Sequence, residues 1–143
     1  MYINQISVFI ENRPGRLSAI TKVLGDNGID IRALSLADTT NFGILRLIVN
    51  DPEKAEKVLR ENGFTVSTTK VVAVQVEDSP GGLHGILETL GEADIGVEYA
   101  YAFITRKTEG AFVILRVENN EAAAEHLAGK GVKLLTAGEI YSI

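Results

Sequence analysis

The 143-residue sequence contains no cysteine and no tryptophan, and it has only one methionine and two histidines. Without cysteine the chain forms no disulfide, no thiolate metal site and no cysteine nucleophile, so nothing ties it to an oxidising compartment. We therefore expect a cytoplasmic protein. The histidines, His84 and His126, lie far apart and outside any short metal-ligand spacing, so we expect neither a metal nor a cofactor.

Positive charge and long apolar runs are also scarce. The chain has 14 Lys and Arg against 19 Asp and Glu, a net charge of −5, whereas nucleic-acid binding needs basic residues that neutralise phosphates. No apolar run approaches the roughly 20 residues of a membrane-spanning helix, and no basic segment of a signal peptide opens the sequence. The sequence thus predicts a soluble, unprocessed protein with no nucleic-acid or membrane partner. Its 45% hydrophobic residues suffice for a core.

An internal repeat organises the chain. The segment Glu11-Asn-Arg-Pro-Gly-Arg-Leu17 returns as Glu77-Asp-Ser-Pro-Gly-Gly-Leu83, a shift of 66 positions (11 to 77). Later matches have a shift of 68 (53 to 121), which predicts a two-residue insertion around residues 105–110. Because the shared positions are turn formers and one helical stripe, they indicate two homologous halves. We expect one unit over residues 1–69 and a second over residues 70–143.

Each half is predicted to have the element order βαββαβ, from alternating strands, one helical stripe and the turn residues between them. The first half has strands over 6–10, 29–37, 44–50 and 64–69. Its helices cover 17–24 and the segment that begins at Pro52, with Asp51 as its N-cap, and ends at Gly63. The second half has strands over 71–77 and 132–140, a helix over 83–93, a hairpin over 95–118 and a helix over 120–128.

This order predicts an α+β fold. A split βαβ arrangement makes a four-stranded antiparallel sheet with both helices on one face. Because about 70 residues are marginal for an isolated core, we expect the two units to bury surface against each other as a fixed pair. The only break expected between the last strand of the first half and the first strand of the second lies at residues 68–70.

The strongest local signal is the strand-to-helix loop of each half, residues 12–15 and 78–81. A glycine beside a first helical turn keeps the backbone accessible, and the free N–H groups of that turn attract a carboxylate or phosphate. Asn12 or Asp78 can present an oxygen to a ligand ammonium or simply cap the helix, and the residues leave both open. Arg16 adds positive charge to the first copy, as Arg13 does, whereas Gly82 adds room to the second.

The run over residues 6–18, with residues 28–31 and 34–35, resembles the ACT domain, the small-molecule regulatory module of amino-acid metabolism, and the second half looks like another copy. The resemblance implies ferredoxin-like units paired side by side, with a free amino acid bound where the first loop of one unit faces the second strand of its partner. The implied ligand-binding positions are Asn12, Arg13, Pro14, Gly15, Arg16 and Leu17 with Leu34, Ser35 and Leu36, and Asp78, Ser79, Pro80, Gly81, Gly82 and Leu83 with Tyr99, Ala100 and Tyr101.

The favoured function is a non-catalytic amino-acid sensor, with a homodimer or a regulated biosynthetic enzyme as its further partner. The first half is most similar to the ACT unit of acetolactate synthase regulatory subunits, so such a subunit is an alternative, although the second half departs from them. A nucleic-acid binder of the RRM type is a weaker alternative, because residues 111–113 echo part of its RNP1 strand. Glu109 and Gly110, however, stand where that motif needs a glycine and an aromatic residue.

Two remaining groups of residues, one with the residue types of a catalytic triad and one of aromatic side chains on a strand, could serve the structure alone. Asp78, Ser79 and His84 have the residue types of a hydrolase triad but lack the strained glycine elbow, so we expect no catalytic residue and no enzyme. His84 follows the second loop and is a further candidate for ligand contact. Tyr99 and Tyr101 alternate with Phe103 on one strand face, where they either stack on a ligand ring or fill a seam between the units.

Overall fold

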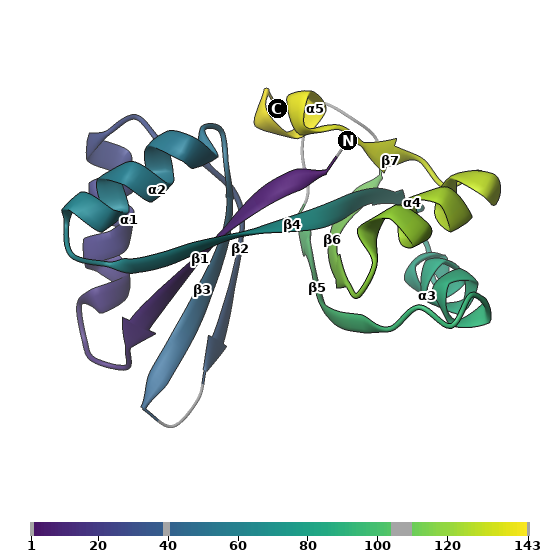
Figure 1. Cartoon of the computed structure of the whole chain (residues 1–143), viewed down its shortest axis with the longest axis horizontal. Coiled ribbons are helices and arrows are strands. Elements are labelled where there is room, and N and C mark those ends of the chain that lie inside the picture. The colour runs from purple at the N-terminus through teal and green to yellow at the C-terminus, as the bar shows by residue number, and fades with distance from the viewer. Residues whose placement is uncertain (1, 39–40, 104–109, 143) are drawn as a thin grey trace. The chain divides into compact units, whose positions relative to one another are not determined.

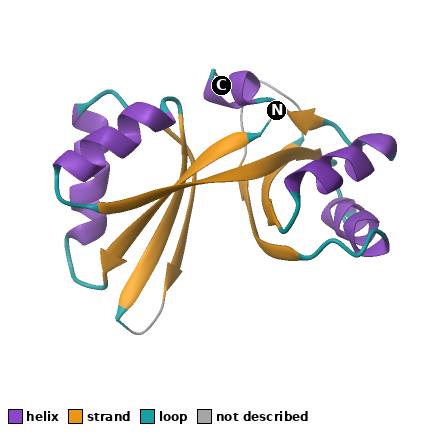
Figure 2. Cartoon of the chain, viewed as in Figure 1, coloured by secondary structure: helices purple, strands orange, loops and turns teal. Residues whose placement is uncertain are grey.

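The computed structural model describes residues 2–38, 41–103 and 110–142. The chain divides into two compact units, one over Asn4–Thr69 and the other over Lys70–Tyr141 together with Tyr2 and Ile3. We call them the N-terminal unit and the C-terminal unit. Both contain helices and antiparallel strands, so the predicted α+β class is confirmed (Figure 2).

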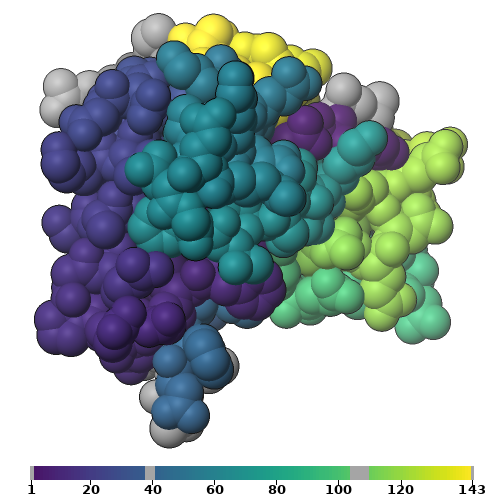
Figure 3. Space-filling view, turned by 60° about the vertical axis from the view of Figure 1, so that its left-hand side comes forward, coloured from purple at the N-terminus to yellow at the C-terminus, as the bar shows by residue number. Residues whose placement is uncertain are grey.

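The N-terminal unit has the sheet order β2-β3-β1-β4, with both helices on one face (Figure 1). The teal surface in the middle of Figure 3 belongs to α2 and the start of β4. Residues 39 and 40 of the predicted hairpin turn lie outside the described part of the chain. The elements are β1 (Ile3–Glu11), α1 (Arg16–Asp26), β2 (Ile31–Asp38), β3 (Phe42–Val49), α2 (Pro52–Glu61) and the first residues of β4 (Thr65–Val76).

Strand alternation builds the core of this unit. Ile6 pairs with Leu47 and Val8 with Leu45, and these four side chains point toward the helices. The helices contribute Ile20, Leu24, Ala55 and Leu59 to the same cluster. On the opposite face, Phe9 is 47% exposed. Of the predicted helical stripe at residues 17, 20 and 24, Ile20 and Leu24 are confirmed as core residues, whereas Leu17 is exposed.

The C-terminal unit repeats the arrangement with the order β5-β6-β4-β7. Its core again joins alternate residues of the first and third strands to one stripe of each helix, including Val74, Leu115, Leu90 and Leu127. The elements after β4 are α3 (Gly82–Glu92), β5 (Val97–Phe103), β6 (Ala111–Val117), α4 (Asn120–Gly129), β7 (Leu134–Leu135) and α5 (Ala137–Tyr141).

The two units match in strand register. Ile10 pairs with Gly43 in the N-terminal unit, and Val76 pairs with Ala111 in the C-terminal unit, so the shift changes from 66 to 68 between the two strands of each pair. Helices α1 and α3 differ in position by 66 residues, and α2 and α4 by 68. The predicted two-residue insertion around residues 105–110 falls largely on residues 104–109, which lie outside the described part.

The predicted break at residues 68–70 is wrong. Residues 65–76 form one continuous strand, β4, whose start belongs to the N-terminal unit and whose remainder belongs to the C-terminal unit. The polar residues at the expected break are mainly threonines, which favour extended backbone, and the strand contains neither glycine nor proline. Polarity alone therefore did not interrupt it.

The last predicted strand, residues 132–140, is also wrong in extent. Only Leu134–Leu135 is a strand, and the short helix α5 follows. The Thr136 N–H and hydroxyl donate to Glu139 Oε1 (3.2 and 3.1 Å), and the Glu139 N–H donates back to Thr136 Oγ1 (3.2 Å). This reciprocal capping box starts the helix and ends the strand.

The starts of the four longer helices are of two kinds. Asp51 caps α2 as predicted, because its Oδ1 accepts from the Lys54 N–H (3.2 Å), and Asn119 caps α4 by accepting from the Ala122 N–H (3.0 Å). Helices α1 and α3 instead begin after a glycine with no side-chain cap. The capping alternative for Asn12 and Asp78 is therefore wrong.

The side-chain caps make a first prediction. Replacing Asp51 by alanine removes the acceptor for a first-turn N–H, and we expect the free energy of unfolding to fall by about 1 kcal/mol. Asn119→Ala, at the equivalent position of the C-terminal unit, should have a similar effect. Urea unfolding followed by circular dichroism measures both, and an unchanged midpoint in both variants would contradict the role of the caps.

Candidate functional site

The β1–α1 loop places an uncapped helix start at the surface. Gly15 is the N-cap residue with φ 86°, a left-handed conformation natural to glycine, and a Cβ there would meet nothing within 4 Å. The Arg16 N–H donates to the Arg13 carbonyl (3.3 Å). The N–H groups of Leu17 and Ser18, in the first turn, have no acceptor within the helix. They are the donors that a carboxylate would use.

A small cleft of about 200 Å³ lies beside this loop on the side of β2. It brings together the predicted site residues Asn12, Arg13, Arg16, Leu17 and Leu36, along with Ile10, Glu11 and Gly43. Leu34 and Ser35 lie on the same strand but do not line the cleft, and Pro14 and Gly15 are exposed in the loop.

The two arginines of this loop are held differently. Arg13 forms an ion pair with Glu11 (2.7 Å) on the surface. The Arg16 guanidinium lies over the Phe64 ring, with its central carbon 4.8 Å from the ring centroid. Its Nε is buried and has no hydrogen-bond partner among the described residues. Within the described part of the chain Arg16 forms no ion pair, so it is the cation of this loop that is not already neutralised.

The β4–α3 loop repeats the uncapped helix start. Gly81 has φ 87°, and a Cβ there would again meet nothing within 4 Å. Gly82, in contrast, has no room for a side chain, because a Cβ would lie 2.2 Å from the Glu77 carbonyl oxygen. The Gly82 N–H donates to the Ser79 carbonyl (3.0 Å). The Leu83 N–H in the first turn has no acceptor within the helix.

A larger cleft of about 830 Å³ adjoins this second loop, and we call it the α3–β7 cleft. Of the predicted site residues, it includes Asp78, Gly81 and Gly82, whereas Ser79, Pro80, Leu83 and His84 do not line it. The other lining residues were not predicted from the sequence; they come from the end of β4, one stripe of α3, the position before β6 and the segment after α4. The lining residues are Gln75, Val76, Glu77, Asp78, Gly81, Gly82, Gly85, Ile86, Thr89, Gly110, Lys130, Gly131, Val132 and Lys133.

The predicted facing positions on β5 do not line the α3–β7 cleft. Tyr99 and Tyr101 are half-buried and Ala100 is exposed. Farther along the strand, the Phe103 ring stacks on that of Phe112 with the centroids 5.3 Å apart. Phe112, the aromatic residue of the RNP1-like segment, is 1% exposed and thus unavailable for stacking on a base.

His84 lies on the solvent side of α3. Its Nε2 is 2.8 Å from Glu88 Oε2, one turn along the helix, and both side chains are mostly exposed. Over residues 2–38, 41–103 and 110–142, no three His, Asp or Glu side chains come together as a metal site. Among the same residues, no helix has the length and apolar character to cross a membrane.

Comparison with known proteins identifies the family. A family model described as ACT domain pair matches residues 1–142. A crystal structure of a protein from Bacteroides thetaiotaomicron is 39% identical, with a TM-score of 0.94, and the match covers 100% of this chain and 98% of that one. No curated protein matches the sequence.

More distant structures share the fold. The ligand-free regulatory subunit of aspartate kinase from Thermus thermophilus is 15% identical with a TM-score of 0.63, over 88% of this chain and 91% of that one. The corresponding subunit from Thermus flavus is 17% identical with a TM-score of 0.57, over 88% and 90%. With its internal repeat, its two βαββαβ units and the family match over nearly its whole length, the chain belongs to the ACT domain pair family, a regulatory amino-acid-binding fold.

Proposed function

We propose that this chain is a non-catalytic sensor of a free amino acid, formed by one ACT unit over residues 1–69 and another over residues 70–143. The observation that carries the proposal is the repeated helix start. Gly15 and Gly81 share the same left-handed backbone, with φ of 86° and 87°, and the space above both is open. Because neither helix has a side-chain cap, the first-turn N–H groups are free to bind an anion.

The ligand carboxylate accepts hydrogen bonds from these N–H groups, near Gly15 to Leu17 or near Gly81 to Leu83. The positive end of the helix dipole favours the carboxylate at both places. In the second loop, the Asp78 carboxylate binds the ligand ammonium, and the open space above Gly81 leaves room beside it. In the first loop, Arg16 is the neighbouring cation, and Asn12 offers a neutral oxygen. We favour the second loop as the tighter site.

Regulation follows from linkage between ligand and conformation. A ligand that binds only one arrangement of the protein stabilises it by RT ln(1 + [L]/Kd), which is about 2.7 kcal/mol at a hundredfold excess over Kd. A partner that recognises this arrangement then responds to the amino-acid concentration. We propose an enzyme of amino-acid biosynthesis as the regulated partner, with acetolactate synthase as one candidate and a homodimer as the alternative assembly.

An amino-acid screen tests the proposal. We expect at least one of the twenty standard L-amino acids, at millimolar concentration, to raise the melting temperature and to give a binding isotherm in calorimetry. The matched control is the corresponding amine without the carboxylate, which should not bind because it cannot accept from the first-turn N–H groups. Absence of both heat and stabilisation for all twenty amino acids would contradict an amino-acid sensor.

A further inference from the structure

The α3–β7 cleft has a smaller counterpart in the N-terminal unit. A cleft of about 180 Å³ there is lined by Phe9, Ile10, Glu11, Arg16, Phe42, Gly63, Phe64 and Thr65. Shifted by 66 positions before the insertion and 68 after it, these residues become Gln75, Val76, Glu77, Gly82, Gly110, Gly131, Val132 and Lys133, and every one of them lines the α3–β7 cleft. The same place in the repeated unit is thus small in one copy and large, at about 830 Å³, in the other.

Backbone geometry supports this equivalence. Phe9 pairs with Ile44 across β1 and β3, and Gln75 pairs with Phe112 at the same place in β4 and β6. The glycines after the second helix of each unit, at positions 63 and 131, have φ of 84° and 81°. The two clefts are therefore copies of one feature of the fold, and their difference in size comes from their side chains.

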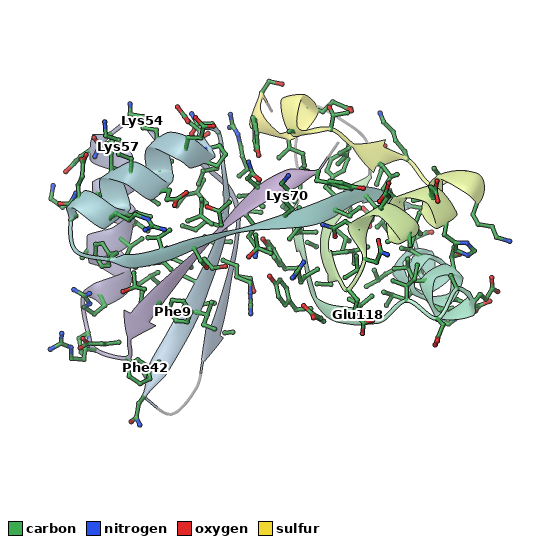
Figure 4. The ribbon with its side chains drawn as sticks, viewed as in Figure 1. Phe9, Phe42, Lys54, Lys57, Lys70 and Glu118 are labelled. Carbon is green, nitrogen blue, oxygen red and sulfur yellow. The ribbon has the colours of Figure 1, made fainter. Side chains whose placement is uncertain are left out.

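Four lining positions differ in residue size between the two copies. In the N-terminal unit, the Arg16 guanidinium stacks on the Phe64 ring. Phe9 and Phe42, both labelled in Figure 4, lie on the adjoining strands and are 47% and 57% exposed. The C-terminal unit has smaller residues at all four positions, so none of these four side chains narrows the cleft. The equivalents of Phe9, Arg16, Phe42 and Phe64 are Gln75, Gly82, Gly110 and Val132.

Backbone requirements explain only part of this change. A Cβ on Gly82 would lie 2.2 Å from the Glu77 carbonyl oxygen, and one on Gly110 would lie 3.0 Å from the Val76 carbonyl oxygen at φ 93°. Glycine is thus required at both positions whether or not a ligand binds. No such requirement applies to Val132 or Gln75, so the chain geometry does not by itself dictate the open cleft.

The cleft also carries charges of opposite sign on its two sides. Glu77 and Asp78 belong to the end of β4 and the loop that follows, whereas Lys130 and Lys133 belong to the segment between α4 and β7. Lys133 is 3.7 Å from Glu139. The other three form no ion pair within the described part of the chain. Asn62 and Thr65 occupy the positions of the two lysines in the N-terminal unit, so the positive side is particular to the C-terminal unit.

We propose that the α3–β7 cleft is the ligand site of the C-terminal unit and that it takes an α-amino acid with a large side chain. The ammonium faces Glu77 and Asp78, and the carboxylate faces Lys130 beside the first turn of α3. Val76, Ile86 and Val132 supply apolar surface for the side chain, in a volume within the usual range of ligand pockets. The N-terminal copy holds no ligand here, because its Arg16 side chain, stacked on Phe64, occupies space that is open in the C-terminal copy.

This inference takes the class of ligand, a free amino acid, from the proposed function. It adds where the ligand binds and that its side chain is large. The residues of α3 that line the cleft, at positions 82, 85, 86 and 89, form one helical stripe. Leu83 and Leu87 lie outside that stripe and remain 42% and 37% exposed. The ligand is thus on the β7 side of α3, away from the β5 positions that the family resemblance indicates.

Two substitutions and one control test the site, with the twenty standard L-amino acids as probes in calorimetry. Val132→Phe introduces the aromatic residue of the N-terminal copy, and Lys130→Glu reverses the charge of an exposed residue. We expect each to weaken the binding seen with the unaltered protein by about tenfold or more, as a filled or charge-reversed pocket should. Lys57→Glu, the same charge change on the exposed side of α2 (Figure 4), should leave affinity unchanged.

The outcomes separate this inference from the proposed function. Tighter binding of leucine, phenylalanine or another large amino acid than of glycine and alanine, lost in both cleft variants, supports the site. If an amino acid binds the unaltered protein and both cleft variants equally, or if glycine binds best, the α3–β7 cleft is not the site, although the sensor function stands. If no amino acid binds the unaltered protein, both proposals fail. Lys130→Glu alters only an exposed side chain, so its result does not depend on whether Val132→Phe folds.

Discussion

Gly81→Val is expected to abolish amino-acid binding, whereas Gly15→Val should leave most of the binding in place. A valine at either position forces a branched side chain into a left-handed backbone, with φ of 87° and 86°. Such a residue costs about 1–2 kcal/mol of stability. The added side chain would also stand over the first-turn N–H groups, where the carboxylate is proposed to bind.

The two variants control for each other. A Cβ at either glycine meets nothing within 4 Å, so the strain comes from the backbone alone and is nearly equal in both. Melting temperatures without ligand should therefore fall by similar amounts, and calorimetry should separate the variants by affinity. If Gly15→Val abolishes binding while Gly81→Val keeps it at equal stability, the arginine-flanked first loop is the main site and our preference for the second loop is wrong.

Local sequence was sufficient for most of the fold because each element carries its own signal. Asp51 followed by Pro52 fixes the start of α2, and both residues take their expected places. Where two sequence signals indicated different structures, the prediction followed the wrong signal. The polar residues at 68–70 were weighed above the β-branched character of the whole strand. At the C-terminus, the capping pair Thr136 and Glu139 was overlooked beside an apolar run.

The candidate site was predictable only where it is contiguous in sequence. The loops that end in Gly15 and Gly81 were found because a repeated motif marks them. Lys130 and Lys133 were missed because they reach the cleft only through the pairing of β7 with β4, where the Gln75 N–H donates to the Lys133 carbonyl (2.9 Å). One sequence signal for the cleft was available. The repeat aligns Phe64 with Val132, so it marks a position where the N-terminal copy has a large aromatic residue and the C-terminal copy a smaller one.

The other large effect is expected in the core of the C-terminal unit. Leu90 is fully buried in α3, among the valines of β4 and β6. Leu90→Ala should lower the free energy of unfolding by about 2–5 kcal/mol, because it removes buried methyl groups and leaves a cavity. That is a large share of the stability of a small protein, which is about 5–15 kcal/mol. Urea unfolding followed by circular dichroism measures the loss.

Leu87→Ala is the matched control, since it is the same substitution on the same helix at a side chain that is 37% exposed. We expect a loss below about 1 kcal/mol there, because much of that side chain is already in water. Leu24→Ala, at the position equivalent to Leu90 in α1, should reproduce the large loss, as Leu24 is also fully buried. Equal losses for Leu87→Ala and Leu90→Ala would mean that α3 does not pack on the sheet through the stripe of Ile86 and Leu90. The side of α3 assigned to the α3–β7 cleft would then have to be revised as well, because Ile86 lines that cleft.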